Sequence, residues 1–474
     1  MLNKSTNLEK EYIRMIKPVL DSNFKPAIVE LRRFFADVQS SGKKQHLIIA
    51  VERAEGCVYR REFDIFEDGI DDERNSFIIE RYIKCILWVV GGFKIYIAGS
   101  HVVFENIKKY YQPGGLREFD YEFMSTVFER PMEVVECTYD NIPQEKTSPV
   151  SIGGHLDGRR IGFDAGGSDL KVSAVLNGKT IYSEEIVWLP KLQSDVNYHY
   201  ENIYKAFKVG VEHLGGDVDA IGISTAGVLV SNKPMVSSLF INVPKKDFEQ
   251  VKQVYIESAR RLGEELGHEI PFVVANDGDV TALAGAIDLK DTGVLGIAMG
   301  TSEAVGYVDE NGNLTGWFSE LAFMPVDFEK TAEVDEWSKD FGVGCKYFSQ
   351  DAVIKLLDKA NIKVDESLTL AEKLKVVQKL MEEGHEGAKK IFETIGVYLA
   401  YTIPFYAEFY NIKHILVLGR VTSGKGGNII LKVCKETLQK EFPEYSHIDI
   451  GMPSEYMRRV GQSIAAASLA ETNK

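Results

Sequence analysis

Apolar and polar positions recur along the chain with two different periods, one helical and one of alternating strands. Over the first 150 residues the pattern predicts helices, a strand pair at 47–51 and 57–66, and a further strand at 94–98. A capping box at 6–9 predicts an opening helix that runs to about residue 20. Farther on, helical stretches separate apolar strands that begin at Ile161, Ala220, Phe272, Leu295 and Ile415. Strands that alternate with helices predict a layered α/β architecture.

A break in this pattern divides the chain. Residues 138–158 mix Pro, Ser, Gly and charged residues without periodicity, which predicts a linker. We therefore expect an N-terminal α/β domain over 1–150, a first lobe over 155–290 and a second lobe over 291–474.

One stretch of the N-terminal domain is similar to a later stretch. LIIAVERAEGCVY (47–59) aligns without gaps on LGIAMGTSEAVGY (295–307). The N-terminal domain is therefore either a degenerate copy of the C-terminal half or a unit whose strand pair resembles it by chance.

Composition narrows the class of protein. The net charge of −15 over 474 residues argues against a dedicated binder of nucleic acid or of anionic membranes. Five cysteines without a CxxC pair argue against a disulfide framework and a four-cysteine zinc site. The N-terminus has no signal-peptide pattern, and the most apolar stretch, 85–92, is too short to span a bilayer. We expect a soluble cytoplasmic protein.

The first stretch that suggests chemistry is IGFDAGGSDLKVSAV (161–175). Two short strands flank a turn that contains Asp164, Gly166 and Gly167. Glycine lets backbone N–H groups approach an anion closely, and a carboxylate can orient Mg²⁺ through water. A plain β-hairpin with Gly-Gly at its turn is the alternative.

The second stretch, FVVANDGDV (272–280), ends a buried strand with polar residues. Asp277 could accept a proton from a substrate hydroxyl while the Asn276 amide fixes another hydroxyl. Asp279 directly precedes the predicted helix, so we expect it to cap that helix.

Two glycine turns follow in the second lobe. Gly300 and Thr301 lie between two predicted strands, where hydroxyl and N–H groups suit phosphate oxygens. Gly419 and Arg420 lie between a strand and a helix N-terminus, a place that suits a nucleotide. The GxxxxGK[ST] spacing of a P-loop is absent.

In this order, the motifs resemble the ROK family of the actin-like sugar-kinase superfamily, over about 155–474. The resemblance implies a two-lobed actin-like fold of duplicated ribonuclease H-like domains, here with an additional N-terminal α/β domain. It implies ATP and Mg²⁺ as cofactors, with Asp277 as the catalytic base and Asp164 as the Mg²⁺ residue acting through water. The nucleotide residues that it implies, besides Asp164, are Gly166, Gly167, Gly300, Thr301 and Gly419; Arg420, a further nucleotide candidate, stands where the family usually has a glycine. The substrate residues that it implies are Asn242, Asn276 and Glu320, with Tyr347 near the position of a sugar-binding glutamate.

The departures from the family concern sugar recognition. Phe323 stands where the family has a histidine that binds both sugar and zinc. The cysteine-rich zinc loop is reduced to a segment with the single cysteine Cys345, so no structural zinc is expected.

The leading hypothesis is an ATP-dependent kinase that phosphorylates a hydroxyl of a sugar or sugar derivative. Its partner is a small hydroxylated molecule, and no nucleic acid or membrane is expected. The helically spaced aromatic residues at 398, 401, 405 and 409 favour a core or an oligomer face.

Two other functions stay open. A non-catalytic actin-like sensor of a metabolite or nucleotide would explain the lost histidine and zinc loop. A ROK-type transcriptional repressor would need an N-terminal DNA reader, yet acidic residues outnumber basic ones over 1–150.

Overall fold

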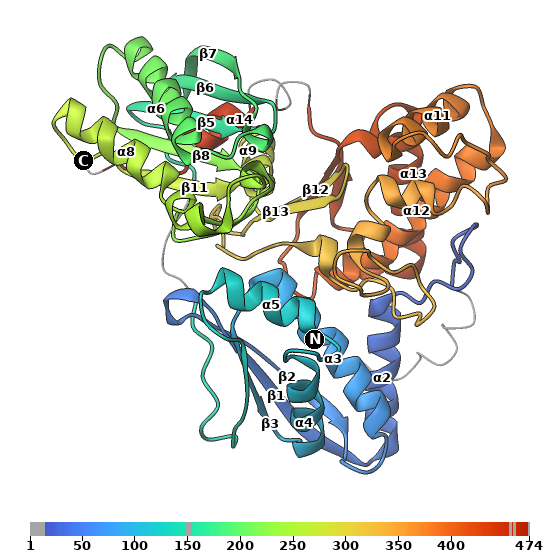
Figure 1. Ribbon diagram of the computed structural model, residues 1–474. Helices are drawn as coiled ribbons and strands as arrows, with labels where there is room; N and C mark the ends of the chain where they lie inside the picture. Colours follow the sequence, from blue (N-terminus) through green and yellow to red (C-terminus); the bar gives the residue numbers. More distant parts are fainter. Residues whose placement is uncertain (1–14, 148–152, 455–456, 458–460, 473–474) are drawn as a thin grey trace.

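The computed structural model describes residues 15–147, 153–454, 457 and 461–472. An N-terminal domain lies below two lobes, the first lobe in green at the upper left and the second in orange at the upper right (Figure 1). Residues 1–14 of the expected opening helix lie outside the described residues, and residues 15–20 form no helix. No helix of the described ranges is long and apolar enough to cross a membrane.

The N-terminal domain is a four-stranded sheet with helices on one face. Its strands, in the order β2-β1-β3-β4, are β1 (Lys44–Glu52), β2 (Val58–Phe66), β3 (Lys94–Ala98) and β4 (Glu133–Glu136). Its helices are α2 (Ala27–Ser41), α3 (Asp72–Val90), α4 (His101–Tyr110) and α5 (Glu118–Val127). Alternate β1 residues, Leu47, Ile49 and Val51, face the helices and join the main core.

If the N-terminal domain is a degenerate copy of the C-terminal half, the two agree in strand order but differ in strand direction. The second-lobe sheet has the corresponding order β13-β12-β14-β15. However, β3 runs antiparallel to β1, whereas β14 runs parallel to β12. Helix α3 connects β2 to β3 and brings the chain back to the same end of the sheet, so β3 runs in the same direction as β2. The N-terminal domain and the second lobe therefore differ in topology.

The first lobe is a five-stranded sheet in the order β11-β8-β5-β6-β7. Its strands are β5 (Arg159–Ala165), β6 (Asp169–Leu176), β7 (Lys179–Val187), β8 (Ala220–Thr225) and β11 (Phe272–Asn276), and a hairpin is formed by β9 (Val228–Val230) and β10 (Lys233–Val236). Its helices are α6 (Val196–His213), α7 (Phe248–Val251), α8 (Val254–Leu266), α9 (Asp277–Leu289) and α14 (Gln462–Ala467).

Helices α6 and α8 cover one face of this sheet, and α9 and α14 cover the other. Helix α14 can lie directly against the strands because Gly222 has no side chain. A Cβ at that position would fall 1.6 Å from the Ala466 carbonyl oxygen. Strands β5, β8 and β11 are parallel, so their carboxyl ends meet at one edge. This edge is the usual place for a ligand in an open α/β sheet.

The second lobe pairs its sheet with long helices. The strands are β12 (Val294–Met299), β13 (Glu303–Val308), β14 (His414–Leu418) and β15 (Asp449–Gly451). The helices are α10 (Gln350–Ile354), α11 (Leu370–Glu382), α12 (Glu386–Tyr406) and α13 (Lys425–Glu441). The aromatic residues at 398, 401, 405 and 409 are all buried, so they belong to the core.

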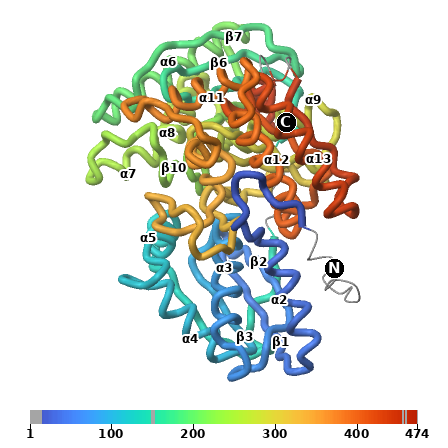
Figure 2. The backbone as a smooth tube through the Cα atoms, turned by 90° about the vertical axis from the view of Figure 1, so that its right-hand side faces the viewer, coloured from blue at the N-terminus to red at the C-terminus, as the bar shows by residue number. Residues whose placement is uncertain are grey.

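One hydrophobic core joins the N-terminal domain to the second lobe. The same cluster of buried residues contains Phe34 and Trp88 from N-terminal helices and Ile297, Tyr398 and Ile415 from the second lobe. From the side, the N-terminal helices run up into this lobe (Figure 2). These two units form one packed body.

Candidate functional site

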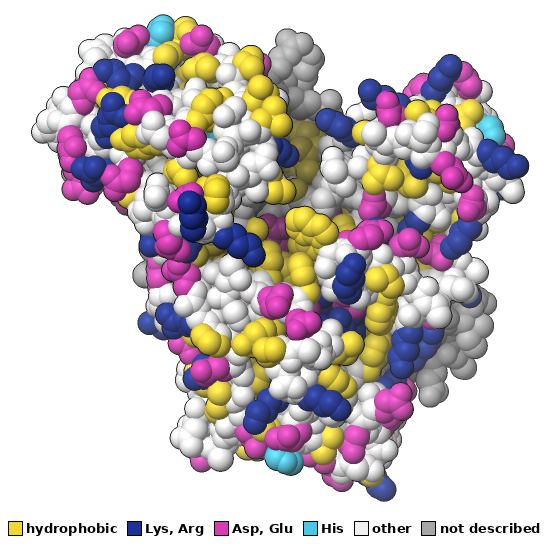
Figure 3. Space-filling model, viewed as in Figure 1, with side chains coloured by type: hydrophobic (Ala, Val, Ile, Leu, Met, Phe, Trp, Pro, Cys, Tyr) yellow, Lys and Arg dark blue, Asp and Glu magenta, His cyan; other side chains and the backbone are white. Residues whose placement is uncertain are grey.

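The site lies where the first-lobe turn, the start of α9 and the β12–β13 hairpin meet. A recess of about 200 Å³ opens there, and the space-filling view shows the molecule hollowed between the two lobes (Figure 3). It is lined by Asp164, Ala165, Gly166, Gly167, Ala226, Asp277, Gly278, Thr281, Gly296, Ala298, Ala304, Leu418 and Gln462. Four residues predicted from distant motifs, Asp164, Gly166, Gly167 and Asp277, therefore share one recess.

The glycine turn is held from two sides. The Gly166 N–H donates to the Asp169 carbonyl oxygen at 3.0 Å, and Trp188 Nε1 donates to the Gly166 carbonyl oxygen at 2.8 Å. A Cβ on Gly166 would lie 2.8 Å from the Asp169 carbonyl oxygen, so the turn has no room for a side chain. Lys191 Nζ lies 3.8 Å from the position of a Cβ on Gly167, which places a cation beside the turn. Such a turn suits an anion.

Asn276, and not Asp279, caps α9. The Asn276 side chain accepts from the Gly278 N–H at 2.7 Å and donates to the Gly227 carbonyl oxygen at 2.9 Å. The predicted capping by Asp279 is wrong because the helix begins at Asp277, three residues before the predicted start. Asp279 lies within the first turn and accepts from the Tyr307 N–H at 3.3 Å. Both ends of the Asn276 amide therefore have protein partners.

Acidic side chains gather around Asp277. Its side chain is exposed toward the recess, and partial desolvation there, with the nearby Asp164, raises its pKa. Burial likewise raises the pKa of Asp164. Burial, and then the charge of Asp277, raises the pKa of Glu320 to about 7, and burial raises that of Asp279 to about 7 as well. Shifted carboxyl groups in a cleft are typical of acid–base sites.

The second-lobe turns border the recess without lining it. Gly300 and Thr301 form the tip of the β12–β13 hairpin, whose inner residues line the recess. Gly419 follows Leu418, and a Cβ on it would lie 2.4 Å from the Met299 carbonyl oxygen. Arg420 is exposed at the start of a short 3₁₀ helix. These residues lie together at the carboxyl ends of β12 and β14, which are parallel.

Two predicted substrate residues lie elsewhere. Asn242 is exposed, and its Nδ2 donates to the Lys191 carbonyl oxygen at 2.6 Å. Tyr347 is buried in the second lobe, and its hydroxyl donates to Asp327 Oδ2 at 2.6 Å. The structure does not bring Tyr347 to the recess, because its ring packs between Phe24 and Tyr398.

Phe323 and the segment that replaces the zinc loop both contact the N-terminal domain, the segment through Arg81, whose Nη2 donates to the Phe341 carbonyl oxygen at 2.8 Å. The Phe323 ring lies 4.5 Å from the Trp88 ring, measured between centroids. The Cys345 thiol contacts Asp335 Oδ1 at 3.6 Å. Among the described residues, no group of three or more His, Cys, Asp or Glu is arranged to hold a metal ion.

Sequence reasoning missed a larger cavity beside the recess. Its volume is about 440 Å³, and its wall includes Arg53 and Phe128 of the N-terminal domain, Asn276 of the first lobe, and Trp317. No motif could reveal it, because Arg53 and Phe128 lie outside the part of the chain that resembles a known family.

Comparisons with known proteins define the fold. No protein-family model and no curated protein matches the chain. The ROK hexokinase from Thermus thermophilus superposes with a TM-score of 0.50 at 14% identity, over 66% of this chain and 97% of that one. A ROK family transcriptional regulator, a homolog of the E. coli MLC protein, gives 0.49 at 14% identity, over 66% and 78%. A ROK family glucokinase from Streptomyces griseus, in complex with glucose and AMPPNP, gives 0.43 at 17% identity, over 66% and 99%.

The two lobes therefore have the actin-like fold of ROK proteins, and the chain carries an additional region. At these identities the likeness shows the fold alone.

Proposed function

We propose that this protein is an ATP-dependent kinase that transfers the γ-phosphate to a hydroxyl of a sugar or sugar derivative. The observation that carries the proposal is the shared recess: Asp277 opens into the same space as Asp164 and the Gly166-Gly167 turn. A base, a metal-orienting carboxylate and an anion-binding turn are the parts that phosphoryl transfer needs.

The residues present fit Mg²⁺ with a nucleotide. Asp164 is a single carboxylate at the recess, and Mg²⁺ is commonly held by one or two carboxylates with water and phosphate oxygens. Mg²⁺ bound there would neutralise charge on the phosphate oxygens. The turn at Gly166 and Gly167 would bind phosphate oxygens through backbone N–H groups, and Lys191 would add a positive charge.

Asp277 would act as the base. As the acceptor oxygen attacks the γ-phosphorus, its proton passes to the Asp277 carboxylate, a new P–O bond forms, and ADP leaves. The raised pKa of Asp277 brings its basicity closer to that needed near neutral pH. Glu320, whose pKa is about 7, would bind a second hydroxyl of the acceptor.

Replacing Asp277 by Asn tests this role. Turnover with ATP·Mg and an accepted sugar should fall by on the order of 10² to 10⁴, while AMPPNP still binds. Asp288→Asn, in the last turn of the same helix, is the matched control and should turn over normally. Wild-type turnover in Asp277→Asn would rule out the assignment.

A non-catalytic sensor is the second candidate. The observation in its favour is that Phe323 and Tyr347, which stand in or near sugar-binding positions, pack into the protein instead. A sensor would bind AMPPNP and a sugar but transfer no phosphate across a panel of hexoses and N-acetylhexosamines. Phosphorylation of any panel member that needs Asp277 excludes the sensor.

A further inference from the structure

The last turn of α3, an N-terminal helix, is hydrogen-bonded to the segment that carries Glu320. The Glu320 N–H donates to the Trp88 carbonyl oxygen, and the Ser319 N–H donates to the Val89 carbonyl oxygen, both at 2.9 Å. Ser319 has a φ of +50°, a left-handed conformation that is strained for a non-glycine residue. Such a backbone persists only where its surroundings hold it. The end of α3 therefore fixes this segment.

Trp88 holds the segment through its side chain as well. Its ring packs against Phe323 at 4.5 Å and against Phe123 at 4.8 Å between ring centroids. Its Nε1 donates to Asp120 Oδ1 at 2.5 Å, and Asp120 belongs to α5. One residue thus connects the Glu320 backbone, the Phe323 ring and a buried carboxylate.

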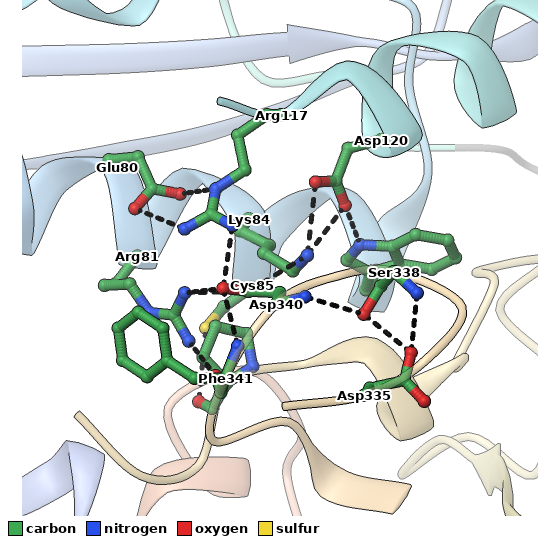
Figure 4. A network of polar contacts seen from close by, with 12 residues as sticks. Glu80, Arg81, Lys84, Cys85, Arg117, Asp120, Asp335, Ser338, Asp340 and Phe341 are labelled. Carbon is green, nitrogen blue, oxygen red and sulfur yellow. Dashed lines mark hydrogen bonds and ion pairs between the residues drawn. The ribbon is translucent and has the colours of Figure 1, made fainter. Parts of the chain in front are cut away.

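That carboxylate belongs to a buried network of charges (Figure 4). Lys84 lies 3.0 Å from Asp120 and 3.1 Å from Asp340, which also pairs with Arg81 at 2.7 Å and with Arg117 at 2.8 Å. The members, three cations and three anions, are Glu80, Arg81, Lys84, Arg117, Asp120 and Asp340.

The network joins the N-terminal domain to the second lobe. Asp340 comes from the second-lobe loop, and the other members come from α3, α5 and the residue before α5. No member side chain is more than 5% exposed. A shift of α3 against this loop would leave buried charges unpaired, which is strongly unfavourable. The network therefore fixes how α3 sits against the second lobe.

We propose that the N-terminal domain forms part of the site where the acceptor sugar binds. We further propose that Trp88, held by the buried charge network, positions Glu320 beside Asp277. Trp88 is a positioning residue, because it acts through the Glu320 backbone. The consequence for catalysis rests on the kinase function proposed above; the positioning of Glu320 does not.

Trp88→Phe tests the positioning directly. Phenylalanine keeps an aromatic ring but loses the N–H that binds Asp120. Amide hydrogen exchange at 319 and 320 should become about tenfold faster or more, because both N–H groups donate to the end of α3. The KM for the best sugar of a hexose and N-acetylhexosamine panel should rise ten- to a hundredfold, on the order expected for a small misplacement. AMPPNP affinity should stay within about twofold, because the nucleotide turns lie elsewhere.

Asn75→Ala is the matched control on the same helix. Asn75 is buried and makes two hydrogen bonds to the Phe66 backbone, far from Trp88 along α3. It should lower thermal stability but leave the sugar KM and the exchange at 319 and 320 unchanged. Should Trp88→Phe fail to fold, Asp120→Leu tests the same link, because leucine has no acceptor for the Trp88 N–H.

The outcomes separate the two proposals. Unchanged exchange at 319 and 320 in a folded Trp88→Phe or Asp120→Leu variant overturns the positioning. Faster exchange with an unchanged sugar KM shows that positioning Glu320 does not affect sugar binding, and it overturns the role of Trp88 there. If the wild type phosphorylates no sugar of the panel, the kinase proposal fails, and the exchange data still decide the positioning.

Discussion

Glu303, the first residue of β13, is a buried carboxyl group that the proposed reaction does not use. It is 3% exposed, and its Oε1 accepts from the Tyr406 hydroxyl at 2.9 Å. Among the described residues its Oε2 has no hydrogen-bond partner. Burial raises its pKa from 4.5 to about 8. The folded protein therefore keeps this proton at pH values where the unfolded chain has released it, so stability falls as the pH rises from about 5 to about 8.

Glu303→Gln should remove this dependence. The loss of unfolding free energy between pH 5 and pH 8 should shrink by about 1 to 3 kcal/mol, because glutamine has no proton to release. Urea unfolding at both pH values measures it. Glu310→Gln, an exposed glutamate just past the same strand, is the control, and an equal effect there would contradict the assignment.

Gly419, in the proposed nucleotide-binding turn after β14, has a backbone conformation and a close contact that both exclude a side chain. Its φ is +101°, and a Cβ would lie 2.4 Å from the Met299 carbonyl oxygen. Gly419→Ala should therefore cost about 1 to 3 kcal/mol and weaken AMPPNP binding. Gly384→Ala is the control, because it shares the positive φ, +83°, with nothing within 4 Å. Equal losses in both variants would show that backbone strain, and not the Met299 contact, decides the cost.

At the scale of elements, the contact between α3 and the 335–341 loop depends on Asp340. Three nearby cations, Lys84, Arg81 and Arg117, hold its pKa well below the usual range despite its burial. Its contribution to stability is therefore present above about pH 4 and is lost as the pH falls below that value. Acid should loosen this contact before it affects apolar contacts.

Asp340→Ala should destabilise the protein by about 3 to 5 kcal/mol, because it leaves three buried cations without their shared anion. Glu383→Ala removes one partner of an exposed pair with Lys379 and should cost at most about 0.5 kcal/mol. Thermal or urea unfolding at pH 7 compares the two. A cost below about 1 kcal/mol for Asp340→Ala would show that the network is not needed for stability.

At the scale of the whole molecule, the N-terminal domain and the second lobe share one core, while the first lobe has fewer links to the N-terminal domain. Those links include the packing of Val127 against Val228 and Met235, and an ion pair of 2.5 Å between Lys252 and Glu129. If the cleft closes, the first lobe should move against the rest of the molecule.

Removing residues 1–150 should therefore leave an insoluble or partly unfolded protein, because the second lobe would expose apolar residues that now face α2 and α3. Co-expression of 1–150 with 155–474 should restore a soluble complex. Size-exclusion chromatography and dye binding to exposed apolar surface report both results. A folded, monomeric 155–474 fragment would show that the shared core is dispensable.

The sequence alone determined the layered α/β fold of two lobes, and its motifs named Asp164, Gly166, Gly167 and Asp277, which the structure brings into one recess. The predicted linker lies partly outside the described residues. These features follow from local signals: the period of apolar residues, glycine turns, and polar residues directly after buried strands. Parallel strands bring such residues to one edge whatever the rest of the chain does.

Only the tertiary structure decided which polar residues stay free for a ligand and what the N-terminal domain does. Asn276 caps α9 because the helix starts three residues earlier than its pattern suggested, and Tyr347 turns into the core because Phe24, far away in sequence, packs against it. The link from Asp340 to Trp88 joins residues that are distant along the chain. Contacts of this kind depend on how separate elements dock, and docking leaves no periodic mark in the amino-acid sequence.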